Sequence, residues 1–503
     1  MSKTMRFAAV LITAVMVLGF GLNCFALAET ADIYVSVNGN DETGDGSQSA
    51  PFATLGKARD YIRTLSKDSD ITVNIGAGEY YVNSSVSFSS QDSGNENCTV
   101  TYKAAYGAVF KNTKKINTDE FKKVTNPEIL KKLKKEVRAD VYALELGLYC
   151  TPSIKTALIL DGERLEFSRY PKDTFLTVNN SDADKTFSVA DNKINEWAKS
   201  DDMFIKGALF STYSWGNADI TDISDSVVTV SKNVRNNAKI YFNNVLEEMS
   251  AVGEYVIDIG SKVMYCILPD DYKTKTAEIT AGSLNSPFIN LNGAGYIKFD
   301  GLNFYGLSNN AVYMTNCKNI SVENCSFNFI NADYAIRIVT GKNINVYSNG
   351  AYKCSGGFVR FSGGNRVTLE SGNINIEKNV ILNCATDLNS CIISSGVNSP
   401  TDTVDAIGNT VKNNIIGDSS PTNAISAVGI YNKVSNNEIY NVSRQIDDGG
   451  AIYYGRSNTK YGNDISYNYI HHLNKAHMFS ALYADDGYGG INMHHNVMYS
   501  MSH

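Results

Sequence analysis

The sequence predicts an all-β protein: a parallel β-helix with an N-terminal capping helix and an inserted β-rich module. Three observations lead to this fold class. Short apolar segments separated by asparagine and glycine recur through residues 283–503. Each segment is too short to bury its own apolar face, so it must stack on its neighbours. No helix-length segment lies between the strands, so they turn directly into one another rather than through helical crossovers.

Residues 1–28 are typical of a secretory signal peptide. Lys3 and Arg6 precede an apolar run from 7 to 20, and an Ala-Leu-Ala cleavage site ends at Ala28. The apolar run is short for a membrane-spanning helix. We therefore expect a secreted, extracellular protein with no membrane insertion after cleavage; a membrane anchor is the alternative.

The charge balance and the cysteines narrow the function classes. The formal net charge is −7 at pH 7, and the signal segment carries two cations and no acid, so the mature chain is more acidic still. Nucleic-acid binding needs lysine and arginine to neutralise phosphates, so we expect no nucleic-acid partner and favour a neutral or basic polymer. The nine cysteines form no C-x-x-C pair, which favours small buried residues over a disulfide scaffold.

The N-terminal region, 29–110, predicts the cap and the first coils of the solenoid. Residues 33–37 form a short alternating strand, and 71–82 form a strand, a glycine turn and a second strand. We expect a helix between them to cover the open edge of the first coil, which would otherwise pair with other chains. The apolar residues that share one face of this helix are Leu55, Ala58, Ile62 and Leu65.

The character of the chain changes between 111 and 282. A short charged helix, "TNPEILKKLKKEV", is followed by hairpin-like pieces of alternating apolar and polar residues. Asp161-Gly162 is a tight-turn signal between two such alternations. We interpret this region as the inserted β-rich module.

The repeat begins at Ser283. When its segments are aligned on the apolar residue that opens each one, asparagine occupies the fourth position in most of them, at intervals of 23 to 35 residues. Stacked asparagines can bond along a ladder at the roughly 4.8 Å strand spacing. The chain stops in the middle of a repeat, so we expect a fragment of a longer protein. The aligned positions are Leu302, Cys325, Asn349, Asn379, Asn414, Asn437, Asn468 and Asn496.

Two similar stretches late in the repeat carry paired acids. "QIDDGGAIYYGR" contains Asp447 and Asp448, and "SALYADDGYGG" contains Asp485 and Asp486. Glycoside hydrolysis needs two carboxyl groups, one to protonate the leaving oxygen and one to attack the sugar or activate water. Turn formation is the alternative explanation, because Asp-Gly is a common turn pair.

Longer stretches resemble a known superfamily. "YVSVNGNDETGDGSQSAPFATLGKARDYIR" resembles the N-terminal segment of secreted right-handed parallel β-helix proteins of the pectate-lyase-like superfamily. "LILDGERLEFSRYP" and "YFNNVLEEMSAVGEYVIDIGSKVMYCILPDD" resemble the inserted module of one branch, and "DDGGAIYYGR" with "LYADDGYGG" resembles its late coils. Within that branch the chain resembles glycoside hydrolase family 141, whose members hydrolyse plant cell-wall glycans, acting on xylan or on fucosylated pectin.

The resemblance implies a right-handed parallel β-helix and hydrolysis by a pair of aspartates. The first aspartate falls on Asp448 and the second on Asp486 or Asp485, between which the match does not choose. Branch members often carry an acid soon after the arginine that matches Arg456. Here a serine and an asparagine follow that arginine, which weakens the case for identical chemistry.

Strand geometry limits how the acids can meet. Aligning Tyr453 with Tyr483 in neighbouring coils leaves Asp448 five residues before its tyrosine and Asp486 three residues after its own. Straight strands would then hold the two acids more than about 20 Å apart, at about 3.3 Å per residue. They can cooperate only if the Asp-Asp-Gly-Gly segment curls back or the register differs.

Polar and aromatic residues near the acids complete the predicted site. All six histidines lie in the last 33 residues, without the spacing of a helical metal motif, so we expect no metal site. The predicted partner is a polysaccharide or oligosaccharide. The predicted substrate contacts are Asp447, Arg456, His472, His477, Tyr454 and Tyr483.

We expect a secreted glycoside hydrolase acting on a plant cell-wall polysaccharide, either xylan or pectin side chains. Two other functions stay open. A polysaccharide lyase would need a lysine or arginine base and calcium held by carboxylates; the acid pairs suit calcium, and Lys475 and Arg456 are the nearby cations. No other cofactor is expected. A non-catalytic, carbohydrate-binding surface solenoid would need only the asparagine ladders and aromatic residues.

Overall fold

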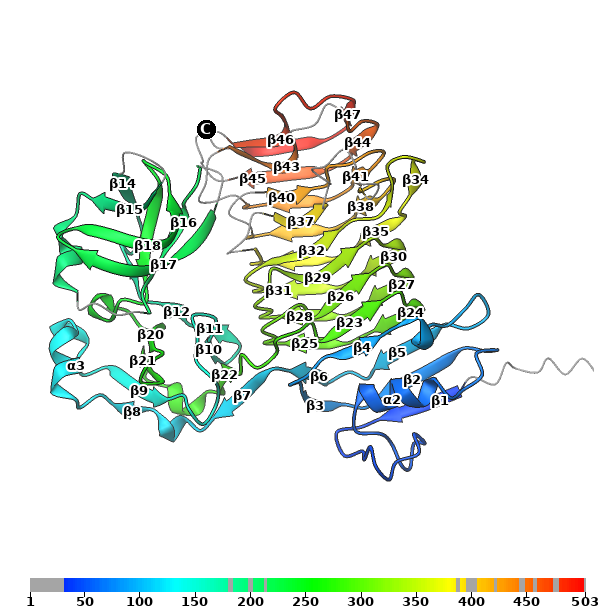
Figure 1. The fold of residues 1–503 in the computed structure, drawn as a ribbon, viewed down its shortest axis with the longest axis horizontal. Coiled ribbons are helices and arrows are strands. Elements are labelled where there is room, and N and C mark those ends of the chain that lie inside the picture. Colours follow the sequence, from blue (N-terminus) through cyan, green and yellow to red (C-terminus); the bar gives the residue numbers. More distant parts are fainter. Residues whose placement is uncertain are drawn as a thin grey trace, which may run out of the picture.

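A computed structural model describes most of the chain. The described residues are 31–179, 184–197, 202–211, 215–385, 390–394, 405–419, 423–442, 448–455, 459–473 and 479–501. They form a solenoid of three long parallel sheets beside a lobe of smaller sheets (Figure 1). The predicted parallel β-helix is confirmed, whereas the predicted signal peptide, 1–28, lies outside the described residues. In the part described, no helix has the length and apolarity needed to cross a membrane.

Each coil of the solenoid contributes one strand to each of three sheets, which we call A, B and C. In their order of pairing, the described strands of sheet A are β1 Ala31–Val35, β2 Ile71–Ile75, β5 Val100–Ala104, β24 Gly295–Asp300, β27 Lys318–Glu323, β30 Lys342–Tyr347, β35 Ile374–Glu377, β38 Thr410–Lys412, β41 Lys433–Ser435, β44 Asn463–Ser466 and β47 Ile491–His494. Those of sheet B are β3 Gly78–Tyr81, β6 Ala108–Lys111, β25 Asn303–Tyr305, β28 Ser326–Asn328, β31 Gly350–Tyr352, β36 Val380–Leu382, β39 Ile415–Gly417, β42 Glu438–Tyr440, β45 Tyr469–Leu473 and β48 Val497–Met501. Those of sheet C are β4 Val86–Phe88, β23 Ile289–Asn292, β26 Val312–Thr315, β29 Tyr334–Val339, β32 Gly357–Phe361, β37 Ser390–Ser394, β40 Asn423–Ser426, β43 Gly449–Gly455 and β46 Phe479–Asp485. A small hairpin, β33 Gly364–Asn365 and β34 Glu370–Ser371, lies between β32 and β35.

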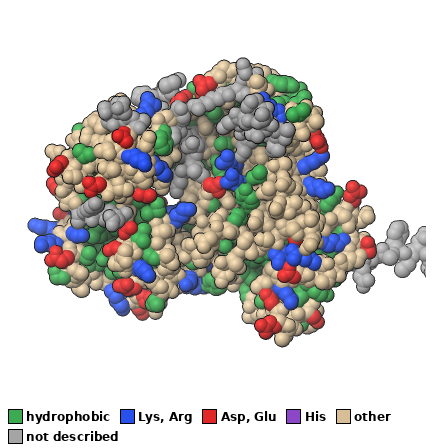
Figure 2. Space-filling model, viewed as in Figure 1, with side chains coloured by type: hydrophobic (Ala, Val, Ile, Leu, Met, Phe, Trp, Pro, Cys, Tyr) green, Lys and Arg blue, Asp and Glu red, His purple; other side chains and the backbone are tan. Residues whose placement is uncertain are grey.

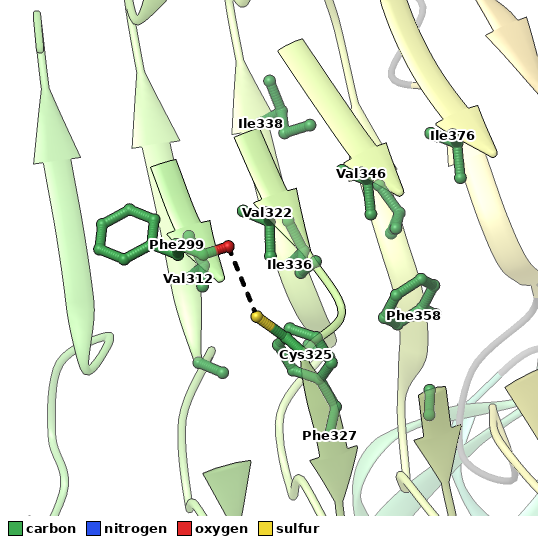
Figure 3. Close-up of a cluster of buried hydrophobic side chains, with 14 of the residues drawn as sticks. Phe299, Val312, Val322, Cys325, Phe327, Ile336, Ile338, Val346, Phe358 and Ile376 are labelled. Atoms are coloured by element: carbon green, nitrogen blue, oxygen red, sulfur yellow. Dashed lines mark hydrogen bonds between the residues drawn. The ribbon is translucent and has the colours of Figure 1, made fainter. Parts of the chain in front are cut away.

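The core of the solenoid is built from stacked rows of identical or similar apolar residues. Adjacent strands pair in register, so that Phe304 lies beside Phe327 and Val322 beside Val346. Because side chains alternate across a strand, each such row points inward along its whole length. Figure 3 shows one stretch of this core, with side chains from all three sheets in contact.

The predicted helix is α2, Leu55–Ile62. Thr54 caps its N-terminus by accepting a hydrogen bond from the backbone N–H of Lys57. The helix buries Leu55, Ala58 and Ile62 against the first coil, as an amphipathic cap over an open sheet edge should.

The predicted asparagine ladder runs along the corner between sheets A and B. The side-chain oxygen of Asn379, for example, accepts from both the backbone N–H and the side-chain amide of Asn349, at 3.0 and 2.9 Å. The same pattern repeats up to Asn496. A second, unexpected ladder of Asn409, Asn432 and Asn463 lies at the corner between sheets C and A. Both ladders satisfy buried backbone groups that the tight corners leave without partners.

The region 111–282 forms the lobe, whose sheets are largely antiparallel and enclose cores of their own. Its one described α-helix is α3, Pro127–Lys132. Its strands are β7 Thr113–Ile116, β8 Lys122–Lys123, β9 Val141–Glu145, β10 Leu158–Leu160, β11 Glu163–Arg164, β12 Glu166–Phe167, β13 Arg169–Tyr170, β14 Leu176–Asn179, β15 Asp184–Val189, β16 Phe204–Ala208, β17 Trp215–Ser224, β18 Val227–Val234, β19 Lys239–Asn243, β20 Glu254–Asp258, β21 Val263–Ile267 and β22 Ala277–Thr280.

The lobe lies against the corner between sheets B and C (Figure 1). Asn331, which follows β28, donates a hydrogen bond to the backbone oxygen of Lys155 at 2.8 Å. Lys353, which follows β31, forms an ion pair with Glu163. The lobe therefore lies beside the edge of sheet C at which the strands of sheet C begin.

Candidate active site

The two acid-bearing stretches lie on neighbouring strands of sheet C. Strands β43 and β46 pair in parallel, with Tyr453 opposite Tyr483 and Gly455 opposite Asp485. The sequence alignment of the two tyrosines therefore predicted the register correctly. Asp448 directly precedes β43, and Asp485 is the last residue of β46.

The start of β43 bends, and this bend brings Asp448 back toward the middle of the strand pair. Asp448 has a left-handed backbone, with φ of 63°. A Cβ atom at Gly450 would lie 2.8 Å from Tyr483 Cβ and 3.1 Å from the backbone oxygen of Ile452. Such close approach is open only to glycine, so the glycines after the acid pair allow the segment to curl back.

Asp448 reaches the neighbouring strand through the hydroxyl of Tyr483. This hydroxyl donates to Asp448 Oδ1 at 2.8 Å. Asp485 lies two residues after Tyr483 on the same face of β46, and the hydrogen bond to Asp448, burial and the influence of Asp485 together raise the pKa of Tyr483. The left-handed turn at Asp448 therefore brings its carboxylate to the strand that carries Asp485.

A second tyrosine holds Asp485. Tyr453 donates to Asp485 Oδ2 at 2.9 Å, and the backbone N–H of Asp486 donates to Oδ1 at 2.8 Å. The Tyr453 ring lies over Gly455, where a Cβ would be 2.2 Å from its hydroxyl oxygen. The two tyrosine rings contact edge to face, with centroids 5.6 Å apart. Tyr453 was missed as a site residue, although its alternation in phase with Tyr483 would have identified it.

Asp485 and Asp486 differ in their settings. Asp486 has a left-handed φ of 48° and begins the turn that follows β46. Its backbone N–H donates to Asp485 Oδ1, and Asp485 is the acid that alternates onto the same face of β46 as Tyr483. Which of the two acids takes part in catalysis stays a prediction.

The other predicted contacts divide into three groups. Tyr454 is 0% exposed and packs in the core against Tyr488; strand alternation points it away from Tyr453, so the structure argues against a sugar contact. His472 is exposed on β45 of sheet B, where its Nδ1 lies 2.7 Å from His471 Nδ1. The predicted contacts Asp447, Arg456 and His477 lie outside the described residues.

The histidines do not assemble a metal site in the part of the chain that the structure describes. His471 bonds to Glu438 at 3.2 Å, and His494 bonds to Asp464 at 3.0 Å. These pairs lie on sheets B and A, away from the acids of sheet C. No group of three histidine, cysteine, aspartate or glutamate side chains among the described residues is placed to hold a metal ion. Calcium stays part of the alternative lyase hypothesis only.

Comparison with known proteins gives structural matches. No protein-family model matches the chain, and no curated protein matches its sequence. A solved structure titled "Glycoside hydrolase" superposes with a TM-score of 0.69 at 12% identity, covering 93% of this chain and 96% of that one. XylC in complex with xylose gives a TM-score of 0.41 at 13% identity, covering 88% of this chain and 70% of that one. The GH136 lacto-N-biosidase of Eubacterium ramulus gives 0.35 at 10% identity, covering 94% of this chain and 68% of that one.

The first of these matches shows that the fold is shared over nearly the whole of both chains. Its coverage includes the lobe as well as the solenoid, since 93% of this chain is aligned. The arrangement of a β-helix beside an inserted lobe is therefore an established architecture.

Proposed function

We propose that this protein is a secreted glycoside hydrolase that cleaves a plant cell-wall polysaccharide, xylan or a pectin side chain. One observation carries the proposal: two tyrosines whose rings contact each other, Tyr483 and Tyr453, donate hydrogen bonds to carboxylates from different coils, Asp448 and Asp485. Glycoside hydrolysis needs such a pair. The shared fold with a solved glycoside hydrolase supports the same reaction class.

The hydrogen bonds assign a role to each carboxyl group. Both oxygens of Asp485 accept hydrogen bonds, from Tyr453 and from the Asp486 backbone, the arrangement that suits an ionised carboxylate. We assign Asp485 as the nucleophile or base. Asp448, which receives the Tyr483 hydroxyl on one oxygen, is assigned as the acid that protonates the leaving oxygen.

We expect hydrolysis with retention of the anomeric configuration. Asp448 and Asp485 are held by two tyrosines whose rings contact each other, and such closely supported carboxylates suit the roughly 5–5.5 Å separation of retaining enzymes better than the roughly 6.5–9.5 Å of inverting ones. We expect the first product released from a reduced xylan or pectin oligosaccharide to keep the configuration of the cleaved bond. Following the anomeric protons by NMR during the first turnovers checks this, and the opposite anomer would contradict it.

The function is tested with purified protein on xylan and pectin. Release of reducing ends is expected from the native protein, with a loss of at least about 10³-fold in Asp448→Asn and Asp485→Asn, because either change removes a reacting group. Asp486→Asn is the matched variant and should keep most of the activity. An unsaturated, light-absorbing product would indicate a lyase, and glycan binding that survives Asp448→Asn without any product would indicate a binding solenoid.

A further inference from the structure

The outer face of sheet C carries a continuous row of side chains that ends at the candidate carboxylates. Adjacent strands pair residue for residue, so that Tyr313 lies beside Arg337, Arg337 beside Arg360, and Arg360 beside Ile393. Toward the C-terminus the same row reaches Tyr453 and Tyr483. We call this set the outer row: Tyr313, Arg337, Arg360, Ile393, Ser426, Tyr453 and Tyr483.

Two arginines in register are an unusual choice for such a row. Neighbouring strands are about 4.8 Å apart, and like charges directly opposite one another destabilise a sheet. The outer row contains no acid in the described residues, and the chain as a whole is acidic, with a net charge of −7. The pair therefore places two guanidinium groups side by side on the face that carries the carboxylates.

Only some of the N–H donors of the Arg337 guanidinium are hydrogen-bonded to described residues of the protein. Its Nη1 contacts Asp333 Oδ2 at 3.0 Å, and the side chain is 33% exposed. Its Nε is buried without a hydrogen-bond partner. The other oxygen of Asp333 is already bonded to Asn310 at 2.6 Å. A guanidinium carries five N–H donors in a planar fork, so donors remain for an anion that approaches the outer row.

We propose that Arg337 and Arg360 form a subsite for an anionic group of the glycan, a uronate carboxylate or a sulfate ester. The proposal deepens the proposed function, on which it rests, because it lays the same glycan along the outer row. Guanidinium groups bind carboxylates and other oxyanions through paired N–H···O bonds. Strand β32 is three strands from β43, so the subsite lies about 14 Å from the carboxylates at about 4.8 Å per strand.

The setting of the subsite fits an extended, acidic polymer. The lobe stands beside this face of the solenoid, and Lys and Arg side chains lie in the middle of the view, with Asp or Glu side chains next to them (Figure 2). Net charge predicts a neutral or basic partner, but net charge describes long-range steering. Local recognition depends on the outer row, which presents the guanidinium groups of Arg337 and Arg360.

Affinity gel electrophoresis of the native protein tests the subsite directly. The gels contain pectate or fully methyl-esterified pectin in one arm, and dextran sulfate or dextran in the other. In at least one arm, we expect the acidic glycan to retard the protein at one tenth or less of the concentration at which the uncharged glycan gives the same retardation. The difference should shrink with added salt, because exposed ionic contacts are screened. The arm that responds identifies a carboxylate or a sulfate.

Three variants assign the effect to the outer row. Arg337→Gln/Arg360→Gln should remove the preference for the acidic glycan, and Arg360→Gln, which leaves the Asp333 ion pair intact, should weaken it at least threefold. Lys298→Gln removes one positive charge from an ion pair on sheet A and should leave the preference unchanged. Equal retardation by both members of each arm, or a preference that survives in the double variant, overturns the proposal.

The outcome is separable from that of the hydrolase proposal. A preference for acidic glycan that depends on the arginines, without release of reducing ends, would support the subsite and overturn the hydrolase. Hydrolysis of neutral glycan with no such preference would support the hydrolase and overturn the subsite.

Discussion

At the scale of single residues, the candidate site depends on two phenol hydroxyls. The Tyr483 hydroxyl donates its one proton to Asp448, and Asp485 lies two residues further along the same face of β46. A donor already placed at a carboxylate stabilises negative charge that develops there during the reaction. Tyr453 then fixes the orientation of Asp485.

Removal of the Tyr483 hydroxyl tests this role. Tyr483→Phe should lower kcat by about 10²-fold, the effect typical of losing one preorganised donor, with a smaller change in KM. Tyr454→Phe is the matched control, because the Tyr454 hydroxyl is buried without a hydrogen-bond partner and its loss should not lower activity. Steady-state kinetics on a common substrate checks both, and equal losses in the two variants would contradict the assignment.

The pH dependence of stability gives a second test of Tyr483. Its pKa is raised above the ordinary value of about 10, first by the hydrogen bond to Asp448. The native state therefore favours the protonated phenol. Its contribution to stability is complete below pH about 10 and is lost as the pH rises through the folded-state pKa. The native protein should have a higher Tm than Tyr483→Phe. This difference in Tm should be constant from pH 7 to 9 and should become smaller above pH 10.

At the scale of elements, the glycines of β43 position the tyrosines. Gly455→Ala would place a methyl group where the Tyr453 hydroxyl lies, so the ring must turn away from Asp485. We expect activity to fall at least tenfold while circular dichroism stays native. Gly489→Ala, which meets nothing within 4 Å, is the control in the next coil. Full activity in Gly455→Ala would show that the Tyr453 contact is dispensable.

The asparagine ladder connects successive coils by hydrogen bonds and so helps to keep their strands in register. Asn437 accepts two hydrogen bonds from Asn414, at 3.0 and 2.9 Å, in a buried corner. Asn437→Ala leaves those donors without an acceptor, at a cost of about 1–3 kcal/mol for each buried group. Asn345→Ala, on the exposed surface of sheet A, should cost less than about 0.5 kcal/mol. Denaturant unfolding measures the difference, and equal effects would contradict a structural role for the ladder.

At the scale of the whole molecule, the lobe forms one side of the face that carries the outer row. The described contacts that hold it at this corner include the hydrogen bond of Asn331 to the backbone of Lys155 and the ion pair of Lys353 with Glu163. Both come from the corner where sheet C begins. A glycan on the outer row would therefore lie beside the lobe, which helps to position it.

Loosening the lobe should affect substrate binding more than chemistry. The double variant Asn331→Ala/Lys353→Ala should raise KM severalfold with little change in kcat, because the carboxylates and tyrosines lie on the solenoid itself. The free energy of unfolding should fall by only about 1–2 kcal/mol, since an exposed ion pair contributes little to stability. Small-angle scattering should show a larger radius of gyration, and an unchanged KM would contradict a role of the lobe in binding.

The sequence by itself determined the solenoid, its cap and the pairing of Tyr453 with Tyr483. Repeat spacing and strand alternation are local properties, and a ladder residue such as Asn379 must recur once per coil. Tertiary structure alone decided which acids meet. A straight strand would keep Asp448 far from β46, and only the left-handed turn at Asp448, with the close approach of Gly450 to Tyr483, brings its carboxylate to the Tyr483 hydroxyl. The second asparagine ladder and the pairing of Arg337 beside Arg360 were hidden for a different reason, because loops of variable length between coils conceal which residues become neighbours.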